Sequence, residues 1–391
     1  MSIRAWLLTV CTVITALGCA DDSDDETPEH SHEEIDFTRF DVALQKAIDD
    51  HNASSPNKIA GASAAVVHEQ LGVVHTKGYG EFKEDRLYLI ASSSKILSVG
   101  VLMRLADEGK LDIDAPIGEY LEAWGDTKAS KITVAQLVSN SSGLPSLTEV
   151  SGAGTDASSP FVSNLCQYSE AGSLEDCGKV LYETDPPRAP DTMFAYGGSQ
   201  WQLAGAVAEL VSGESWASLV DSTYREPCDV PTLGYTNQFG KSGGRGYPAF
   251  FQAKKENLPE TDNPSIEGGA FVTVGDYAKL LVMHLRGGTC GDNRVLSEEA
   301  TTRMQKDRVA SYDGSTGNAN APGYGLGFWI NEANQTVTDP GAYGSFPLLD
   351  LKRRYGVFIA IELTSEVGTK LGMAVKPSLD AIFDEADIHE D

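Results

Sequence analysis

The order of the expected strands and helices is the feature that most constrains the fold. Residues 59–80 hold two apolar runs around a turn at Glu69–Gly72, which predicts two strands near the N-terminus. Three more strands are predicted near the C-terminus, at residues 325–330, 345–351 and 355–363. Strands at both ends of the chain, with helices between them, favour one mixed sheet built from the two ends and carrying a helical insertion.

Several other segments predict helices, because their apolar residues recur at helical spacing. They cover residues 40–52, the stretch after Ser92 up to a glycine stop at Gly109, and residues 132–139, 199–213, 274–288 and 375–386. Residues 150–190 are polar and rich in Gly, Ser and Pro, so we predict a long loop or lid there.

The chain is strongly acidic, which limits its partners. It has 391 residues, with 57 Asp and Glu against 30 Lys and Arg, giving a net charge of −27. This charge argues against nucleic acid or an anionic membrane surface as a partner. A hydrophobic content of 41% and a charged content of 22% predict a globular protein.

The N-terminus is typical of an export signal. Arg4 precedes an apolar run, Ala5–Leu17, that is too short to span a bilayer, so residues 1–18 are predicted to be a signal peptide. Cys19 then resembles the lipidated residue of a bacterial lipoprotein; ordinary signal peptidase cleavage nearby is the alternative. Residues 19–36 form an acidic tether. We expect an exported protein of the bacterial cell envelope, facing the periplasm or the cell surface, that meets the membrane only through a lipid on Cys19.

Four cysteines remain in the mature chain, an even number that fits two disulfides in an exported protein. Pairing of Cys166 with Cys177 would close a local loop and leave Cys228 with Cys290. The spacing of the first two cysteines is not that of metal ligands, so we predict no metal site and no cofactor.

Ser92 and Lys95 are the first candidate catalytic residues. Three residues apart on one helix, they share a face, with Cβ atoms about 5–6 Å apart. Serine is a weak nucleophile until a base takes its proton, and a lysine desolvated by apolar walls can become that base. The helix N-terminus would favour a developing oxyanion. Spacing selects Ser92 over Ser93 and Ser94; the alternative is a helix cap beside a solvated lysine.

Further segments resemble the serine β-lactamase-like hydrolases, which comprise class C β-lactamases, D-alanyl-D-alanine carboxypeptidases and related esterases. The resemblance runs in family order from about residue 38 to 385. It rests on residues 59–80 and 89–121, on ITVAQLVSNSSGLP (132–145) and FAYGGSQWQLAGAVAELVSG (194–213), and on residues 266–288 and 324–330.

The resemblance implies an α/β region plus a helical region, with a mixed, mainly antiparallel sheet flanked by helices and an all-helical insertion. Residues 37–391 would form one domain, with 150–190 as an insertion or lid. Ser92 would be the acylated nucleophile, Lys95 its base and Tyr196 a second acid–base group. The backbone N–H groups of Ser92 and Ala342 would form the oxyanion hole. The alternative for Tyr196 is a buried aromatic with a satisfied hydroxyl.

The chain departs from the family pattern on the opposite wall of the expected cleft, where we assign Asn140, Gly198, Asp339 and Gly341 to substrate binding. Gly198 stands where the lactamase and peptidase branches usually have Asn, and Asn140 where the family usually has His. Asp339 replaces the usual cation of the third motif. Because an anion there would repel a substrate carboxylate, a neutral or cationic substrate is favoured.

The sequence therefore predicts an exported serine hydrolase that acts through an acyl-enzyme on an ester or amide, as an esterase more than a β-lactamase. Its partner would be a small-molecule or peptide substrate, and we expect a monomer. The alternative is a non-catalytic surface protein of the same fold that binds a ligand or peptidoglycan.

Overall fold

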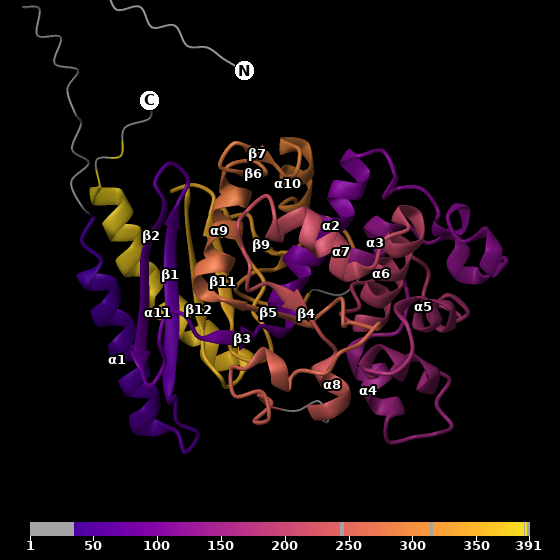
Figure 1. Ribbon diagram of the computed structural model, residues 1–391, viewed down its shortest axis with the longest axis horizontal. Coiled ribbons are helices and arrows are strands. Elements are labelled where there is room, and N and C mark those ends of the chain that lie inside the picture. Colours follow the sequence, from indigo (N-terminus) through magenta and orange to yellow (C-terminus); the bar gives the residue numbers. More distant parts are fainter. Residues whose placement is uncertain (1–34, 243–245, 313–315, 387, 389–391) are drawn as a thin grey trace, which may run out of the picture. The chain divides into compact units, whose positions relative to one another are not determined.

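The computed structural model describes residues 35–242, 246–312, 316–386 and 388 (Figure 1). Its main sheet has seven strands in the order β2-β1-β12-β11-β10-β9-β8. These strands are β1 (Gly61–His68), β2 (Gly72–Gly80), β8 (Gly323–Tyr324), β9 (Trp329–Asn331), β10 (Thr336–Thr338), β11 (Phe346–Asp350) and β12 (Tyr355–Ala360). A three-stranded sheet joins β3 (Leu87–Leu89), β5 (Ala270–Thr273) and β4 (Gly234–Tyr235), and β6 (Thr289–Cys290) pairs with β7 (Asn293–Arg294).

The two ends of the chain meet in the main sheet, which confirms that prediction. Strand β1 pairs antiparallel with β12, with Ser63 opposite Ala360 and His68 opposite Tyr355. All eight residues of β1 are buried. Because helices cover both faces of β1 and β12, every residue of both strands is buried, without the alternation between buried and exposed positions of a half-buried strand.

Helices flank the main sheet on both sides. Helix α1 (Thr38–Ser54) lies beside α11 (Ser365–Glu385) on one side, and α9 (Val274–Leu285) covers the other (Figure 1). Helix α11 begins ten residues earlier than the predicted helix at 375–386 and contains Pro377. Among the described helices, none is both long and apolar enough to cross a membrane.

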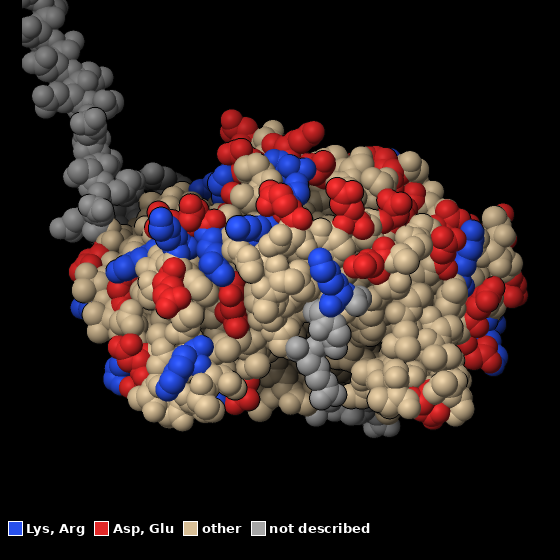
Figure 2. All heavy atoms as spheres, turned by 60° about the horizontal axis from the view of Figure 1, so that its bottom comes forward, with Lys and Arg blue, Asp and Glu red and all other residues tan. Residues whose placement is uncertain are grey.

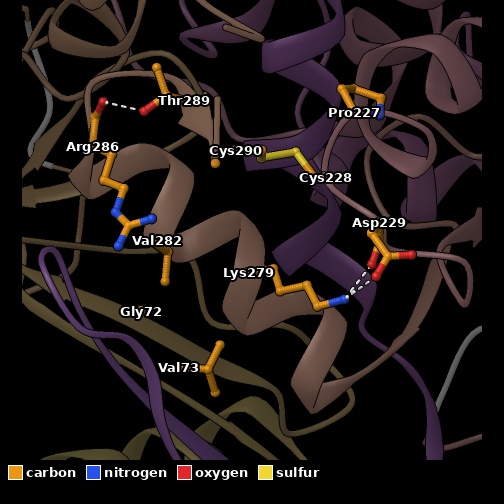
Figure 3. Close-up of a pocket in the computed structure, with 11 residues that line it drawn as sticks. Gly72, Val73, Pro227, Cys228, Asp229, Lys279, Val282, Arg286, Thr289 and Cys290 are labelled. Atoms are coloured by element: carbon orange, nitrogen blue, oxygen red, sulfur yellow. Dashed lines mark hydrogen bonds and ion pairs between the residues drawn. A yellow bond between two sulfur atoms is a disulfide. The ribbon is translucent and has the colours of Figure 1, made fainter. Parts of the chain in front are cut away.

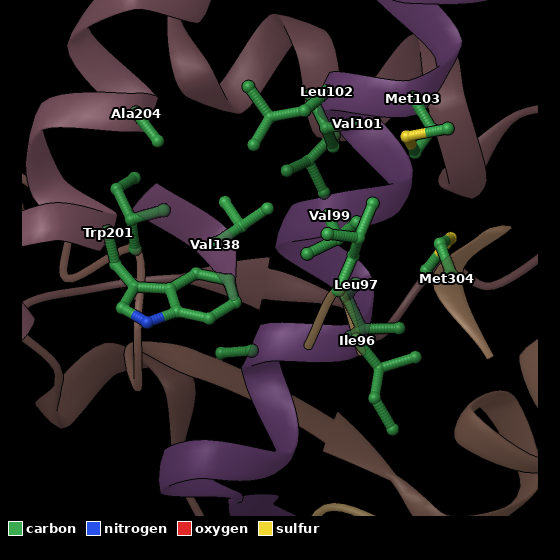
Figure 4. Close-up of a cluster of buried hydrophobic side chains, with 14 of the residues drawn as sticks. Ile96, Leu97, Val99, Val101, Leu102, Met103, Val138, Trp201, Ala204 and Met304 are labelled. Carbon is green, nitrogen blue, oxygen red and sulfur yellow. The ribbon is translucent and has the colours of Figure 1, made fainter. Parts of the chain in front are cut away.

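The other helices form the helical region and its connections. They are α2 (Ser94–Asp107), α3 (Val134–Val138), α4 (Leu147–Ala153), α5 (Leu174–Tyr182), α6 (Gly198–Ser212), α7 (Trp216–Val220), α8 (Gln238–Ser242) and α10 (Glu298–Met304). Helix α2 runs through the middle of the core, where Val99 and Leu102 pack among Val138, Trp201 and other apolar side chains (Figure 4). A helix that is apolar on all sides is buried on all sides, and this one carries the serine and lysine at its start.

About half of the segment 150–190 is helical, so the prediction of one long loop there was wrong. It contains the end of α4, a 3₁₀ helix at Val162–Tyr168 and all of α5. Ser146 and Ser173 cap α4 and α5 by accepting hydrogen bonds from the backbone N–H three residues on. Ser173, one of the serines that suggested a loop, is therefore a helix cap.

Both expected disulfides are present. Cys166 pairs with Cys177 and Cys228 with Cys290, with Cα–Cα distances of 5.5 and 5.0 Å. Disulfides of this kind are typical of proteins outside the cytosol, which agrees with a predicted extracellular or periplasmic location. The predicted signal peptide and Cys19 lie outside the described residues.

Candidate active site

Ser92 lies at the junction between the small sheet and α2. Strand β3 ends at Leu89, and a short 3₁₀ turn, Ala91–Ser93, leads into the helix. Ala91 has a φ of 44°, in the left-handed region that non-glycine residues rarely occupy. Such a conformation costs about 1–3 kcal/mol and persists only where the surroundings fix it, as they do at many functional sites.

The side chains of Ser93 and Ser94 hold this turn in place. The Ser93 hydroxyl donates to the Asp339 carbonyl at 2.7 Å and lies 2.8 Å from the Ser345 hydroxyl. The Ser94 hydroxyl donates to the Ala91 carbonyl at 2.6 Å and accepts from the Ala270 N–H at 3.0 Å. Both side chains are buried in these contacts, and neither forms a hydrogen bond with Lys95 or Tyr196 among the described residues.

Ser92 Oγ is the point at which the three predicted catalytic side chains meet. Tyr196 donates its hydroxyl proton to Ser92 Oγ at 2.8 Å, and Lys95 Nζ donates to the same oxygen at 3.2 Å. Lys95 Nζ also lies 4.6 Å from the centre of the Tyr196 ring. These distances are within the reach needed for proton transfer to and from the serine.

Lys95 is completely buried and has two contacts with a residue that the sequence did not indicate. Its Nζ donates to the Glu267 carbonyl at 3.0 Å and lies 3.4 Å from Glu267 Oε2. Burial lowers the pKa of Lys95, but the nearby acidic groups, of which the Glu267 carboxylate is the one in direct contact with Nζ, outweigh it and raise this pKa above its ordinary value. The prediction that apolar walls would favour a neutral lysine does not hold for the resting protein, because acidic groups share those walls.

Tyr196 is held by aromatic packing just before α6. Its ring stacks on Trp329 with centroids 5.7 Å apart, and Phe194 and Tyr324 contact it from other directions. Burial raises the pKa of Tyr196, while the nearby Lys95 charge lowers it; the net pKa is above its ordinary value. The phenol is therefore protonated at neutral pH and is placed as an acid.

A cavity of 370 Å³ opens onto this group. Ser92, Tyr196 and Ala342 all line it. Its apolar side chains are Leu147, Ala321, Trp329, Pro340, Phe346, Leu348 and Met373, and its amides are Asn318, Asn320, Asn331 and Asn334. Among the described lining residues only Lys376 is charged, and its ammonium group is paired with Asp350 and Asp380 at 3.0 and 2.7 Å.

The four residues assigned to substrate binding do not line this cavity, so that assignment needs correction. Asn140 is buried with a φ of 56°, and its Oδ1 accepts from the Gly197 N–H, the Gln200 amide and the Trp201 indole at 2.9–3.4 Å. Asn140 therefore holds the Tyr196 segment against α6. Gly198 is also buried, at the first residue of α6.

Asp339 and Gly341 lie behind the cavity wall. The Asp339 carboxyl is fully buried, and neither oxygen has a hydrogen-bond partner among the described residues. Burial raises the pKa of Asp339 well above its ordinary value, although Lys95 lowers it, so the neutral acid is favoured. Gly341 packs so closely that an added Cβ would lie 2.0 Å from the Ile90 carbonyl oxygen. The next residues along the chain, Pro340 and Ala342, form the wall.

Glu267 and Trp329 are the site residues that sequence reasoning missed. Both stand in segments that resemble the family, IEGGAF and YGLGFWI. A charged residue before a glycine pair, in an otherwise apolar stretch, was the available signal for Glu267. The signal for Trp329 was weaker, since an aromatic residue in a predicted strand is ordinary core.

A second cavity, of 330 Å³, lies beside the Cys228–Cys290 disulfide and shares no lining residue with the first (Figure 3). Its Lys279 binds the Asp229 carboxylate at 3.2 Å, so that cation is already paired. Acidic side chains are spread over the face shown in Figure 2, with basic ones among them. Within the described part of the chain, no group of three or more His, Cys, Asp or Glu is placed to hold a metal ion.

The fold and the site together define the class of β-lactamase-like and penicillin-binding proteins. The defining features are an antiparallel sheet flanked by helices, a Ser-x-x-Lys motif at the start of a buried helix, and a tyrosine hydroxyl that donates a hydrogen bond to the serine. The chain belongs to the Beta-lactamase family, whose sequence profile matches residues 44–374. This match confirms the predicted family and fold. The family is one of serine hydrolases.

Similar proteins carry several different names. The chain is 23% identical over 332 residues to Protein flp of Staphylococcus aureus (strain COL), covering 80% of this chain and 61% of that protein, less than two thirds of its length. It is 24% identical over 333 residues to Penicillin-binding protein 4 of Amycolatopsis lactamdurans, covering 80% and 82%. The solved structure of EstCE1, a hydrolase with promiscuous acyltransferase activity, superposes with a TM-score of 0.67 at 17% identity, covering 86% of this chain and 98% of that one.

Proposed function

We propose that this protein is an exported serine hydrolase that forms an acyl-enzyme on Ser92 with ester or amide substrates, and that it prefers neutral esters to β-lactams. The convergence of Tyr196 OH and Lys95 Nζ on Ser92 Oγ, at 2.8 and 3.2 Å beside an open cavity, is the observation that carries the proposal. Similarity to EstCE1 in fold agrees with a hydrolase.

In this mechanism Ser92 Oγ attacks the substrate carbonyl while Lys95 takes the serine proton. Tyr196, protonated in the resting protein, gives its proton to the leaving group. The backbone N–H groups of Ser92 and Ala342 would stabilise the oxyanion, since both residues border the cavity. Water then attacks the acyl-enzyme, and the same groups act in the reverse direction.

The composition of the cavity wall favours a neutral substrate over an anionic one. Its polar side chains are mainly amides and hydroxyls, and its one described cation, Lys376, already binds two carboxylates. A penicillin or a D-Ala-D-Ala terminus carries a carboxylate and would find no free positive charge on the described wall. A neutral ester needs none.

Labelling with a fluorophosphonate probe tests the proposal. We expect the purified protein to be labelled, Ser92→Ala to lose the label, and Ser93→Ala to keep it if it folds. Absence of labelling in the unmodified protein would favour the alternative, a non-catalytic protein that binds a ligand or peptidoglycan.

A comparison of two substrates tests the preference for esters. Hydrolysis of nitrocefin at a rate matching that of p-nitrophenyl acetate, and lost in Lys95→Ala, would overturn this preference.

A further inference from the structure

Lys95 is charged in the resting protein, although the proposed mechanism requires it to act as a base. A lysine can take the serine proton only as a neutral amine, yet the Lys95 ammonium lies 3.0 Å from the Glu267 carbonyl oxygen and 3.4 Å from the Glu267 carboxylate, contacts that favour its charged form. It must therefore pass a proton to another group before it acts as a base. Glu267 Oε2, at 3.4 Å from Lys95 Nζ, is the carboxylate oxygen within reach among the described residues.

We infer that Glu267 is the proton acceptor that lets Lys95 act as the base for Ser92, an inference that rests on the proposed function. Lys95 gives one ammonium proton to Glu267 Oε2 and takes the proton of the Ser92 hydroxyl as Ser92 Oγ bonds to the substrate carbonyl carbon. Tyr196 then protonates the leaving group. The proton on Glu267 returns through Lys95 to the Tyr196 phenolate, so each group regains its starting state.

The space that Glu267 occupies comes from the glycine at position 198. A Cβ built on Gly198 would lie 2.2 Å from Glu267 Oε1 and 2.1 Å from Gln167 Oε1. Any side chain there would displace both groups. The loss of the usual asparagine from the second motif is thus coupled to a carboxylate from a segment nearly 70 residues further along the chain.

Gln167 provides an unpaired hydrogen-bond acceptor on the Oε1 side of the Glu267 carboxyl, opposite the oxygen that faces Lys95. Its Nε2 donates to the Asn164 carbonyl and to Ser199 Oγ, both at 3.0 Å, which fixes the direction of the amide. Its Oε1 is buried and has no hydrogen-bond partner among the described residues. Because this oxygen and Glu267 Oε1 lie within 2.2 Å of the same point, Gln167 would accept a hydrogen bond from the Glu267 carboxylic acid when its proton is carried on Oε1.

Asp339 and Glu267 differ in whether they contact Lys95. Both carboxyls influence Lys95, but no ion pair or hydrogen bond joins Asp339 to it among the described contacts. Glu267 contacts Lys95 twice, through its carbonyl and its carboxylate. The charged or titratable groups around Glu267 are Lys95, Tyr196, Asp339, Tyr168 and Tyr324. Of these, Lys95 alone is a cation able to donate.

The test is the rate of acylation of Ser92 by p-nitrophenyl acetate in Glu267→Gln, which keeps the shape but cannot accept the proton. We expect a loss of about 100-fold or more at pH 7, measured at a temperature where the variant is folded, because loss of the buried ion pair should lower its melting temperature. Lys95 must then lose its proton to solvent, so the rate should rise about tenfold per pH unit between pH 7 and 9. Glu267→Asp should recover part of the rate. Glu362→Gln, which removes a carboxylate paired with Arg86 at 2.6 Å, is the matched control and should leave the rate unchanged.

Gly198→Ala is a second test of the role of Glu267 that does not change Glu267 itself. Its Cβ should push the carboxylate away and lower the acylation rate in the same direction, whereas Gly275→Ala, where an added Cβ meets nothing within 4 Å, should not. If the unmodified protein acylates Ser92 and Glu267→Gln does so within threefold, the inference is wrong and the proposed function stands. If the unmodified protein is never acylated on Ser92, the proposed function fails and the inference fails with it.

Discussion

At the scale of single residues, some contacts of the candidate site can be predicted from the spacing of residues along the chain and others cannot. Ser92 and Lys95 lie three positions apart on one helix, so their meeting follows from helix geometry. Tyr196 follows from the family resemblance. Glu267 lies 172 residues from Lys95, and no local pattern indicates that the two side chains touch. Its effect on the charge of Lys95 became visible only in three dimensions.

Tyr196→Phe tests the role of the phenol directly. The ring would keep its packing on Trp329, but the donor to Ser92 Oγ would be lost. We expect kcat for esters to fall by about 10²–10⁴-fold, and to fall more for alkyl esters than for p-nitrophenyl esters, whose leaving group needs less help from an acid. Tyr324→Phe is the matched control, because the buried Tyr324 hydroxyl lies beside Asn140, whereas Tyr196 is the tyrosine that donates to Ser92 Oγ. Equal losses in both variants would rule out this role for Tyr196.

At the scale of elements, sequence patterns located most long helices and the end strands well, but missed the first ten residues of α11 and interpreted the connecting region poorly. Amphipathic spacing found α1 and α6 within a few residues. The segment 150–190 was misread because its polar composition hides two short helical stretches, the 3₁₀ helix at Val162–Tyr168 and α5, which Ser173 caps. Asp339 was misplaced for another reason: resemblance to a motif gives a position along the chain but not the direction of a side chain after a strand ends.

The two disulfides should differ in their effect on chemistry. Cys166 adjoins Gln167 and its 3₁₀ helix, whereas the Cys228–Cys290 pair lines the separate cavity of Figure 3. Replacing either pair by serine should lower the free energy of unfolding by about 2–4 kcal/mol. Loss of Cys166–Cys177 should also slow acylation of Ser92, because Gln167 is less well held. Chemical denaturation and acylation rates, compared between the two double variants, measure this; equal acylation rates would contradict it.

At the scale of the whole molecule, charge should select substrates before they reach the site. The chain carries a net charge of −27, and the described cavity wall offers no unpaired cation. We expect p-nitrophenyl butyrate to have a kcat/KM at least about tenfold above that of p-nitrophenyl hemisuccinate, which differs by a terminal carboxylate. Added salt should narrow the gap, since it screens the long-range field. A hemisuccinate that reacts as fast as the butyrate would show that a cation is available after all.

The most direct measurement is the site of acylation in protein mixed with p-nitrophenyl acetate and quenched within one turnover, mapped by peptide mass spectrometry. We predict one acetyl group on Ser92, none in Ser92→Ala, and a slower appearance of the same adduct in Glu267→Gln. An acetyl group on another residue, or turnover that persists in Ser92→Ala, would contradict the assignment of Ser92 as the nucleophile.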